Sequence, residues 1–298
     1  MPTARPVVGG SAGRSAALAL ALALGACASV PPVQLAYGAG ADGALAARPL
    51  PCDARAPTAA VLPAAALPGA ELRVLSWNLH KNADPGWDAA LSGYAARSDL
   101  LLVQEAALTP ELRALLAASG HAHWTLAGSW GLGGVETGVL SAARVAPLAE
   151  CVQRAFEPLL QLPKAALISH FALEGSDAPL AVANLHAVNF TLGMQEFRAQ
   201  LDALVQVLEL HSGPMIVAGD FNTWSAQRLQ AMHEAMARLT LAAVTPAADR
   251  RTRVFGQQID HLFVRGLELR AAEVPEVDAS DHNPLLATLR LAATAASR

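Results

Sequence analysis

Cysteine, aromatic residues and charged residues are all scarce in this sequence. The 298 residues include three cysteines, and only 5% of the side chains are aromatic and 15% are charged. Three cysteines cannot form a framework of several disulfides, so a hydrophobic core has to hold the fold, and a hydrophobic content of 53% is sufficient for one. The sequence also lacks a His-Glu-x-x-His motif and any compact His and Cys spacing, which argues against a zinc hydrolase.

An excess of positive charge is also missing. The formal net charge is −4, and removal of an N-terminal segment that contains Arg5 and Arg14 would leave 19 basic against 25 acidic residues. An acidic protein has no general electrostatic attraction for polyanions, so non-specific binding to nucleic acid is disfavoured. A nuclease would then need a local basic patch.

The N-terminus has the features of an export signal. Two arginines precede the apolar run from Ala16 to Ala26, which is too short to cross a bilayer. The run ends in Leu-Gly-Ala-Cys, which resembles the bacterial lipobox, so we predict a signal peptide over residues 1–26 and lipidation of Cys27. Ala28 then implies an outer-membrane lipoprotein that faces the periplasm or the cell exterior and contacts the membrane through its anchor. The alternative is a plain signal peptide in which Cys27 has no role.

Residues 27–70 are rich in Ala, Pro and Gly, which predicts a tether between the anchor and a folded domain over residues 71–298. Cys52 and Cys151 are the other two cysteines. A disulfide between them is one alternative in an oxidising compartment, and two buried free thiols are the other. The sequence has no internal repeat and no second hydrophobic domain, and we expect a monomer.

Short apolar runs that end in polar residues recur after residue 71. They predict buried strands over residues 72–78, 99–106, 135–143, 180–189, 214–222 and 259–266. Helical patterns cover residues 109–119, 194–211 and 225–240. Thr109 and Pro110 suit the first turn of the first of these helices. The alternation of predicted strands and helices along the chain indicates an α/β fold, but it does not specify the order of the strands in the sheet.

Polar side chains stand at the ends of several predicted strands, where α/β proteins place their sites. Asn78 and Glu105 follow the first two strands, although each alone is equally well explained by a turn. In the segment IVAGDFNTW, Gly219 permits a close backbone approach, and Asp220 and Asn222 point the same way. The alternative for this segment is an Asx-turn that caps the following helix.

Imidazoles and carboxylates recur near the C-terminus. Asp281 and His282 precede a terminal apolar strand, and Asp260 begins the strand before it. A histidine oriented by a carboxylate is the expected general base or charge-stabilising group. His186 offers a second imidazole at a strand end, where a structural role is the alternative.

These motifs occur in the order SWN, QEA, TGVLS, NLHAVN, GDFN, IDHLFV and SDHNPL. In this order they resemble the endonuclease/exonuclease/phosphatase superfamily over the range Arg73 to Leu289, and the segments WNLHKN, NLHAVNFTLG and SDHNPLL are most similar to its YafD-like bacterial branch. The resemblance implies a four-layer α/β sandwich, in which two packed β-sheets are flanked by helices.

The resemblance also implies a metal-dependent phosphodiesterase. Glu105 would be the principal ligand of Mg²⁺ or Mn²⁺, with Asn78 beside it and Asp281 in support. Oxygen ligands suit such hard cations. The substrate would be a phosphodiester, either nucleic acid or a phospholipid head group. The alternative is a binding or scaffold lipoprotein that retains the fold without the reaction.

Catalytic roles follow from the same resemblance. Asp220 would orient or activate the attacking water, and Asn222 would hold a phosphate oxygen. His186 would contact the phosphoryl group, and His282 paired with Asp260 would act as a general base. Which imidazole is base and which is acid stays open.

Two further sets of residues have two interpretations each. Basic side chains near the motifs could contact substrate phosphates or be solvated surface; they are His80, Lys81, Arg250, Arg251 and Arg253. Trp124 and Trp130 could line a substrate mouth or pack in the core.

Overall fold

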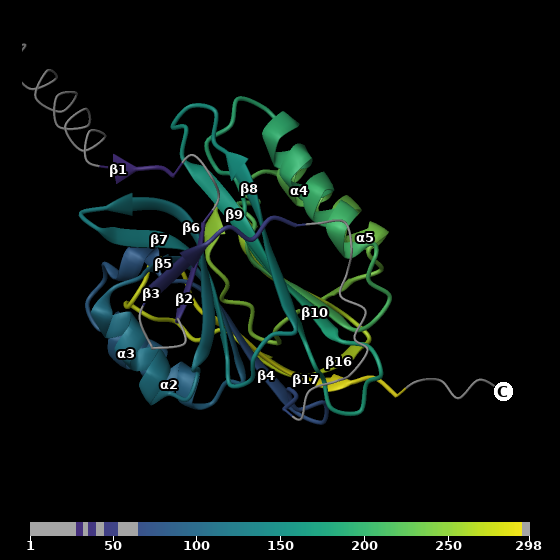
Figure 1. Ribbon diagram of the computed structural model, residues 1–298. Coiled ribbons are helices and arrows are strands. Elements are labelled where there is room, and N and C mark those ends of the chain that lie inside the picture. Colours follow the sequence, from purple (N-terminus) through teal and green to yellow (C-terminus); the bar gives the residue numbers. More distant parts are fainter. Residues whose placement is uncertain (1–27, 32–34, 40–44, 53–64, 294–298) are drawn as a thin grey trace, which may run out of the picture.

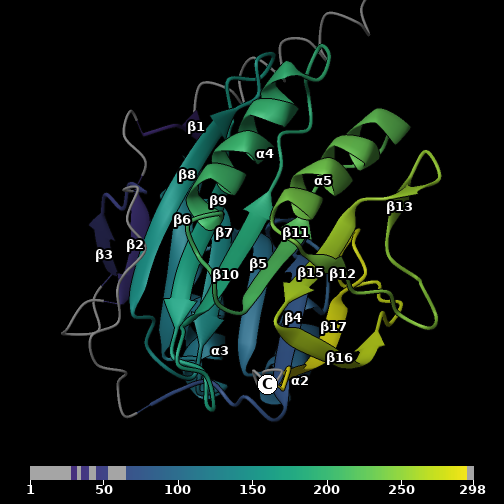
Figure 2. The same cartoon turned by 90° about the vertical axis from the view of Figure 1, so that its right-hand side faces the viewer.

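Two β-sheets packed face to face occupy the centre of the computed structural model, which describes residues 28–31, 35–39, 45–52 and 65–293. Helices α4 and α5 cover the outer face of one sheet, and α2 and α3 cover that of the other (Figures 1 and 2). This is the α/β sandwich with two sheets and flanking helices that the resemblance implied. The predicted signal peptide and Cys27 lie outside the described residues.

The larger sheet contains nine strands within the described residues. Their order is β16-β17-β4-β5-β7-β6-β2-β3, and β1 pairs with β6. The strands are β1 (Ala28–Ser29), β2 (Ala36–Ala39), β3 (Leu45–Arg48), β4 (Leu72–Asn78), β5 (Leu100–Ala107), β6 (His123–Leu132), β7 (Val135–Ala143), β16 (Leu267–Glu273) and β17 (Leu285–Leu291). Only β4 and β5 are parallel neighbours in this sheet.

The smaller sheet has the strand order β12-β15-β11-β10-β9-β8. Its strands are β8 (Ala149–Phe156), β9 (Pro163–Phe171), β10 (Leu180–His186), β11 (Met215–Asp220), β12 (Ala242–Ala243) and β15 (Asp260–Arg265), and a separate hairpin pairs β13 (Arg253–Val254) with β14 (Gln257–Gln258). Strands β10 and β11 are parallel and run upward in Figure 2. All six apolar runs predicted from the sequence form strands.

The helices are α2 (Trp87–Ala96), α3 (Pro110–Ala118), α4 (Gln195–Leu208) and α5 (Ala226–Arg238), with a short turn η1 (His80–Asn82) before α2. The three predicted helices correspond to α3, α4 and α5. The Thr109 hydroxyl caps α3 by accepting from the Leu112 N–H at 3.3 Å, and the Ser225 hydroxyl caps α5 in the same way. Helix α2 was not predicted, because it begins without a capping side chain.

The main core lies between the two sheets. Leu72, Leu100 and Leu102 of the larger sheet pack with Val182 and Ile216 of the smaller one. The outer faces of β4 and β5 pack on α2 and α3, and those of β10 and β11 pack on α4 and α5. Because the central strands are buried on both faces, their sequences are continuous apolar runs instead of alternating patterns.

Part of the segment predicted as a tether belongs to the folded domain. Strand β2 pairs with β6, β3 pairs with β2, and Tyr37 is buried against β6. Cys52 and Cys151 form a disulfide, which is one of the two alternatives left open. A composition rich in Ala and Gly gave no sign of this, because an edge strand is held mainly by backbone hydrogen bonds and needs few large side chains.

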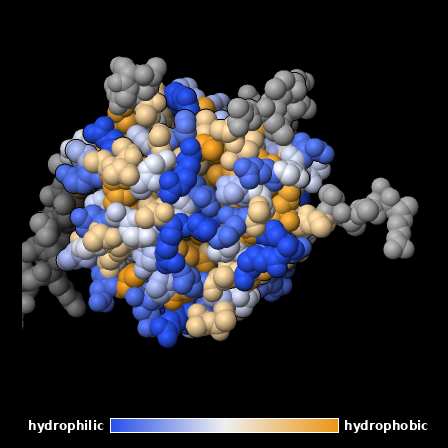
Figure 3. Space-filling view, turned by 90° about the horizontal axis from the view of Figure 1, so that it is seen from below, coloured by the Kyte–Doolittle hydropathy of each residue, from blue (hydrophilic) through white to orange (hydrophobic). Residues whose placement is uncertain are grey.

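The described helices do not have the length and apolar content needed to cross a membrane. On the face shown in Figure 3, hydrophilic side chains separate small apolar areas. That face therefore has no continuous apolar surface of the kind that marks a large interface.

Candidate active site

The candidate site lies where strands of both sheets end. Asn78 ends β4 and lies in the larger sheet, whereas His186 and Asp220 end the neighbouring strands β10 and β11 of the smaller one. The Asn78 Nδ2 donates to Asp220 Oδ2 at 3.1 Å, and Asp220 Oδ2 lies 3.5 Å from His186 Nε2. These contacts bring residues from two sheets into one cluster.

Glu105 reaches this cluster through an irregularity in β5. Its φ is 49°, and the register with β7 shifts between Val103 and Ala106. The carboxylate forms an ion pair with Lys81, and its Oε1 lies 3.8 Å from Lys164 Nζ and 3.7 Å from His186 Nε2. Burial by itself raises the pKa of this carboxyl, but the imidazole and the two ammonium groups outweigh it and lower the pKa to about 2. Glu105 is therefore ionised.

The loop after β11 holds Asp220 in place. Gly219 has a φ of 140°, and a Cβ there would lie 1.9 Å from the Leu185 carbonyl oxygen, so only glycine fits. Asp220 Oδ1 accepts from the Asn222 N–H at 2.9 Å, and Asn222 Nδ2 donates to the Ala187 carbonyl at 3.0 Å. The Asx-turn is thus present, but it does not cap α5, because Ser225 does so. The turn uses Asp220 Oδ1, and Oδ2 faces the cluster. The Asn222 amide secures the loop, and its contact with phosphate stays a prediction.

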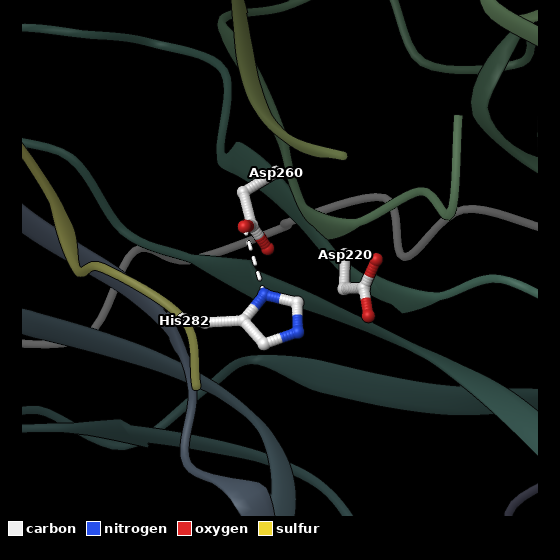
Figure 4. Close-up of side chains that lie close together, drawn as sticks. All are labelled: Asp220, Asp260 and His282. Atoms are coloured by element: carbon white, nitrogen blue, oxygen red, sulfur yellow. Dashed lines mark hydrogen bonds and ion pairs between the residues drawn. The ribbon is translucent and has the colours of Figure 1, made fainter. Parts of the chain in front are cut away.

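Buried carboxylates surround the second histidine. His282 Nδ1 lies 2.8 Å from Asp260 Oδ2 (Figure 4). The Trp77 indole donates to the His282 carbonyl at 2.8 Å. Asp220, Asp260 and His282 each offer an atom within 4.8 Å of the others. Burial opposes a charge on this ring, but Asp260, Asp220 and a third carboxylate raise the pKa of His282 to about 10. Burial raises the pKa of Asp220 to about 6, with His282 opposing the shift and Asp260 adding to it.

The nearest partner of His186 is a positively charged side chain, whereas that of His282 is a carboxylate. His186 Nε2 lies 2.9 Å from Lys164 Nζ, which in turn lies 3.9 Å from the buried carboxylate of Glu157. Burial and the Lys164 charge hold the pKa of His186 well below its usual value. Since this ring is uncharged, it accepts a hydrogen bond from Lys164.

Asp281 stands at the outer edge of the site. Its side chain is 58% exposed, and its oxygens lie 3.9 Å from His282 Nε2 and from His80 Nε2. It has no hydrogen bond or ion pair with Asn78 or Glu105, both of which are described. The three residues predicted to hold a metal are therefore not equally placed. Asp220 contacts Asn78 directly, whereas Asp281 contacts the two histidines at the edge of the site.

The turn η1 presents Lys81 to Glu105. His80, Lys81 and Asn82 all have positive φ, between 46° and 61°, which is unusual for three consecutive residues with side chains. The Asn82 amide donates to the Ala107 carbonyl at 2.8 Å and accepts from its N–H at 3.3 Å, which holds the turn on β5. Such strained backbone persists where the surroundings over-determine it, commonly at functional sites.

Sequence reasoning missed two basic residues of the site. Lys164 is the second residue of β9, and no motif marks it, but the chain contains only two lysines and both contact Glu105. Arg228 of α5 is buried, and its Nη1 donates to the carbonyls of Val188 at 2.7 Å and Asn222 at 3.1 Å. It thereby connects the loops after β10 and β11.

A cavity of about 160 Å³ opens beside Glu105. Its lining includes both lysines, His186, Trp130 and Phe190. Trp130 therefore faces the cavity, whereas Trp124 packs against the core beside α2 and α3. The three arginines noted in the sequence have internal partners: Arg250 pairs with Glu276, Arg251 with Asp249, and Arg253 donates to the Gly256 carbonyl.

Comparison with known proteins agrees with the motifs. Residues 75–282 match the model of the Endonuclease/Exonuclease/phosphatase family. A UPF0294 protein of Vibrio campbellii is 44% identical over 222 residues, which cover 74% of this chain and 78% of the relative.

Two solved structures have a similar fold. The first is an endonuclease/exonuclease/phosphatase from Beutenbergia cavernae, with a TM-score of 0.61 and 21% identity over 75% of this chain and 72% of that one. The second is a mannosyl-6-phosphatase from Bacteroides thetaiotaomicron, with a TM-score of 0.56 and 18% identity over 73% and 99% of the two chains. At these identities the likeness concerns the fold.

Proposed function

Because the chain belongs to the endonuclease/exonuclease/phosphatase family, whose members hydrolyse phosphoesters, we propose that it is a metal-dependent phosphodiesterase. It cleaves a phosphodiester, in nucleic acid or in a phospholipid head group, by attack of water. The observation that carries this proposal is the convergence of Glu105, His186, Asp220 and His282 in one cluster.

The donor set fits a hard divalent cation. Glu105 is ionised, and the Asn78 amide and the Asp220 carboxylate lie in the same cluster, so the ligands on offer are mainly oxygen atoms. Glu105 and Asn78 would hold Mg²⁺ or Mn²⁺, with Asp281 or Asp220 in support. When bound, such a cation neutralises charge that develops on the phosphoryl oxygens.

The side chains of this protein supply the remaining steps. Asp260 Oδ2 accepts a hydrogen bond from His282 Nδ1–H, which leaves Nε2 as the nitrogen that exchanges a proton with water or with a phosphoryl oxygen. Asp220 orients the attacking water. Lys164 and His186 contribute one charge and one hydrogen bond to the phosphoryl group from the other side.

The proposal extends to the location of the protein. Cleavage before Cys27 and its lipidation would make the protein an outer-membrane lipoprotein. The disulfide between Cys52 and Cys151 supports an oxidising compartment, since such bonds are rare in the cytosol. Globomycin, which blocks signal cleavage of lipoproteins, should cause a precursor to accumulate, and a Cys27→Ala variant should escape this effect.

The test of function is hydrolysis by the purified protein of bis-p-nitrophenyl phosphate, p-nitrophenyl phosphate, plasmid DNA and phospholipid vesicles, with Mg²⁺, Mn²⁺ or a chelator. We expect turnover of a diester that the chelator abolishes, and a loss on the order of 10³ in Glu105→Gln, since metal electrostatics supply most of the acceleration. Glu111→Gln, an exposed carboxylate on α3, is the matched control. Chelator-resistant turnover would refute the metal dependence, and a lack of turnover would favour the inactive binding lipoprotein.

A further inference from the structure

Large apolar side chains are exposed around the mouth of the cavity beside Glu105. We call this set the apolar rim; its members are the half-buried Trp130 and the exposed Leu132, Leu159, Leu160, Phe190 and Leu192. The exposed fractions are 40% for Leu132, 58% for Leu159, 50% for Leu160, 52% for Phe190 and 83% for Leu192. Single exposed apolar residues are ordinary, whereas a group beside a catalytic cleft marks an interaction site.

The rim gathers around one cavity, and its members come from the end of β6 and from two loops. Trp130, Leu160 and Phe190 line the same cavity. The loop between β8 and β9 is joined to the loop between β10 and α4 by the Asn189 N–H, which donates to Glu157 Oε1 at 2.8 Å. Leu132 ends β6, two residues beyond Trp130. One apolar surface therefore borders the entrance to the candidate site.

The described chain begins at this same place. The backbone of Ala28 pairs with Leu132, and Ser29 pairs with Gly131. Ala28 directly follows Cys27, the predicted site of lipidation. An acyl group at Cys27 would accordingly enter the membrane next to the apolar rim.

We propose that the apolar rim docks on a lipid bilayer, so that the candidate site opens at the membrane interface and takes the phosphodiester of a lipid head group. This inference rests on the proposed function for its substrate class. A bilayer suits the rim because stable membrane attachment requires more than one weak contact. The side chains of the rim would be buried in the membrane and would supply a contact in addition to the lipid anchor. Lys81 and Lys164 in the cavity then face an anionic head group.

The test uses the mature chain from Ala28, exported with a cleavable signal peptide so that no acyl group is attached. Its partition onto vesicles of phosphatidylethanolamine and phosphatidylglycerol is measured by sedimentation. We expect the double variant Leu159→Glu/Leu192→Glu to lower the partition coefficient by at least about ten-fold, since each buried leucine contributes an order of magnitude. Leu210→Glu is the matched control, because Leu210 is 53% exposed but lies beyond the opposite end of α4.

Several outcomes would overturn the inference. It fails if the wild type does not bind vesicles, if Leu210→Glu weakens binding as much as the double variant does, or if the double variant changes only the oligomeric state in solution. Hydrolysis of soluble bis-p-nitrophenyl phosphate is measured in parallel, and the double variant should retain it. Vesicle binding that depends on the rim, without any hydrolysis, would uphold the docking surface and refute the proposed function, whereas hydrolysis without binding would do the reverse.

Discussion

The two histidines of the site are equally buried and yet have opposite proton affinities. His186 is 5% exposed and His282 is 8% exposed, so burial disfavours the charged form of both rings. The nearest partner of His282 is a carboxylate and that of His186 is an ammonium group. The pKa of His282 rises to about 10, and that of His186 falls well below its usual value. Neighbouring carboxylates therefore overcome burial at His282, whereas at His186 burial and the Lys164 charge act in the same direction.

Under the proposed function, this difference would give the two sides of the site different roles. The His282 side concentrates carboxylates around a positive ring, and the His186 side concentrates lysines around a carboxylate and a neutral ring. A phosphoryl group between them would meet a proton-exchanging side and a charge-neutralising side. Substitutions at three positions can break or sharpen this comparison.

The largest effect is expected on the proton-exchanging side. His282→Ala should lower kcat/KM for a diester by on the order of 10³, because a positioned acid or base contributes about 10² to 10⁴ in rate. Steady-state kinetics with the best substrate measure this loss. His233→Ala, on the surface of α5, is the control. Activity within ten-fold of wild type, with the fold intact by circular dichroism, would remove His282 from the mechanism.

A smaller effect is expected on the charge-neutralising side. Lys164→Met should lower kcat by about 10- to 100-fold, since it removes one charge and the hydrogen bond to His186. Lys164→Arg should recover part of the rate, which a purely structural role would not predict. If Lys164→Met and Lys164→Arg lower kcat equally, Lys164 contributes to the reaction through its shape and not through its charge.

The smallest effect concerns the stability of the fold. Like His186, His170 is a buried histidine with a lowered pKa, but it lies away from the site. Burial, and to a lesser extent His211, lower the pKa of His170 to about 4. The unfolded chain binds a proton at about pH 6.5, so the free energy of unfolding should fall as the pH drops from about 6.5 towards 4. Urea unfolding should show that His170→Gln reduces the loss between pH 7 and pH 5 by about 1 kcal/mol. The exposed His123→Gln should leave this loss unchanged.

Much of the fold could be predicted because its central strands are apolar on both faces and its helices are amphipathic. The runs that became β4, β5, β10 and β11 are of this kind. Strands β2 and β3 were not predicted, because strands at a sheet edge are held by backbone hydrogen bonds and do not need a recognisable pattern of apolar side chains. The register shift that turns Glu105 towards His186 is likewise invisible in a run of apolar residues.

The candidate site was predictable where its residues stand in contiguous motifs. Asp220 and His282 belong to such motifs, and the structure places them together with Asp260. Lys164 could not be found in this way, because it reaches His186 only through the pairing of β9 with β10. The rarity of lysine was the one signal in the sequence that pointed to it.

The disulfide between Cys52 and Cys151 changes how the molecule carries a mechanical load. It closes a loop across 99 positions of the chain, and this loop contains β4, β5, β6 and β7. A pull on the N-terminal end first loads the pairing of β1 and β2 with β6, and at Cys52 the covalent bond passes it to β8. If β1 and β2 detached under such a pull, the covalent bond would still keep the chain between Cys52 and Cys151 from being extended, and β4 and β5, which carry Asn78 and Glu105, lie within it.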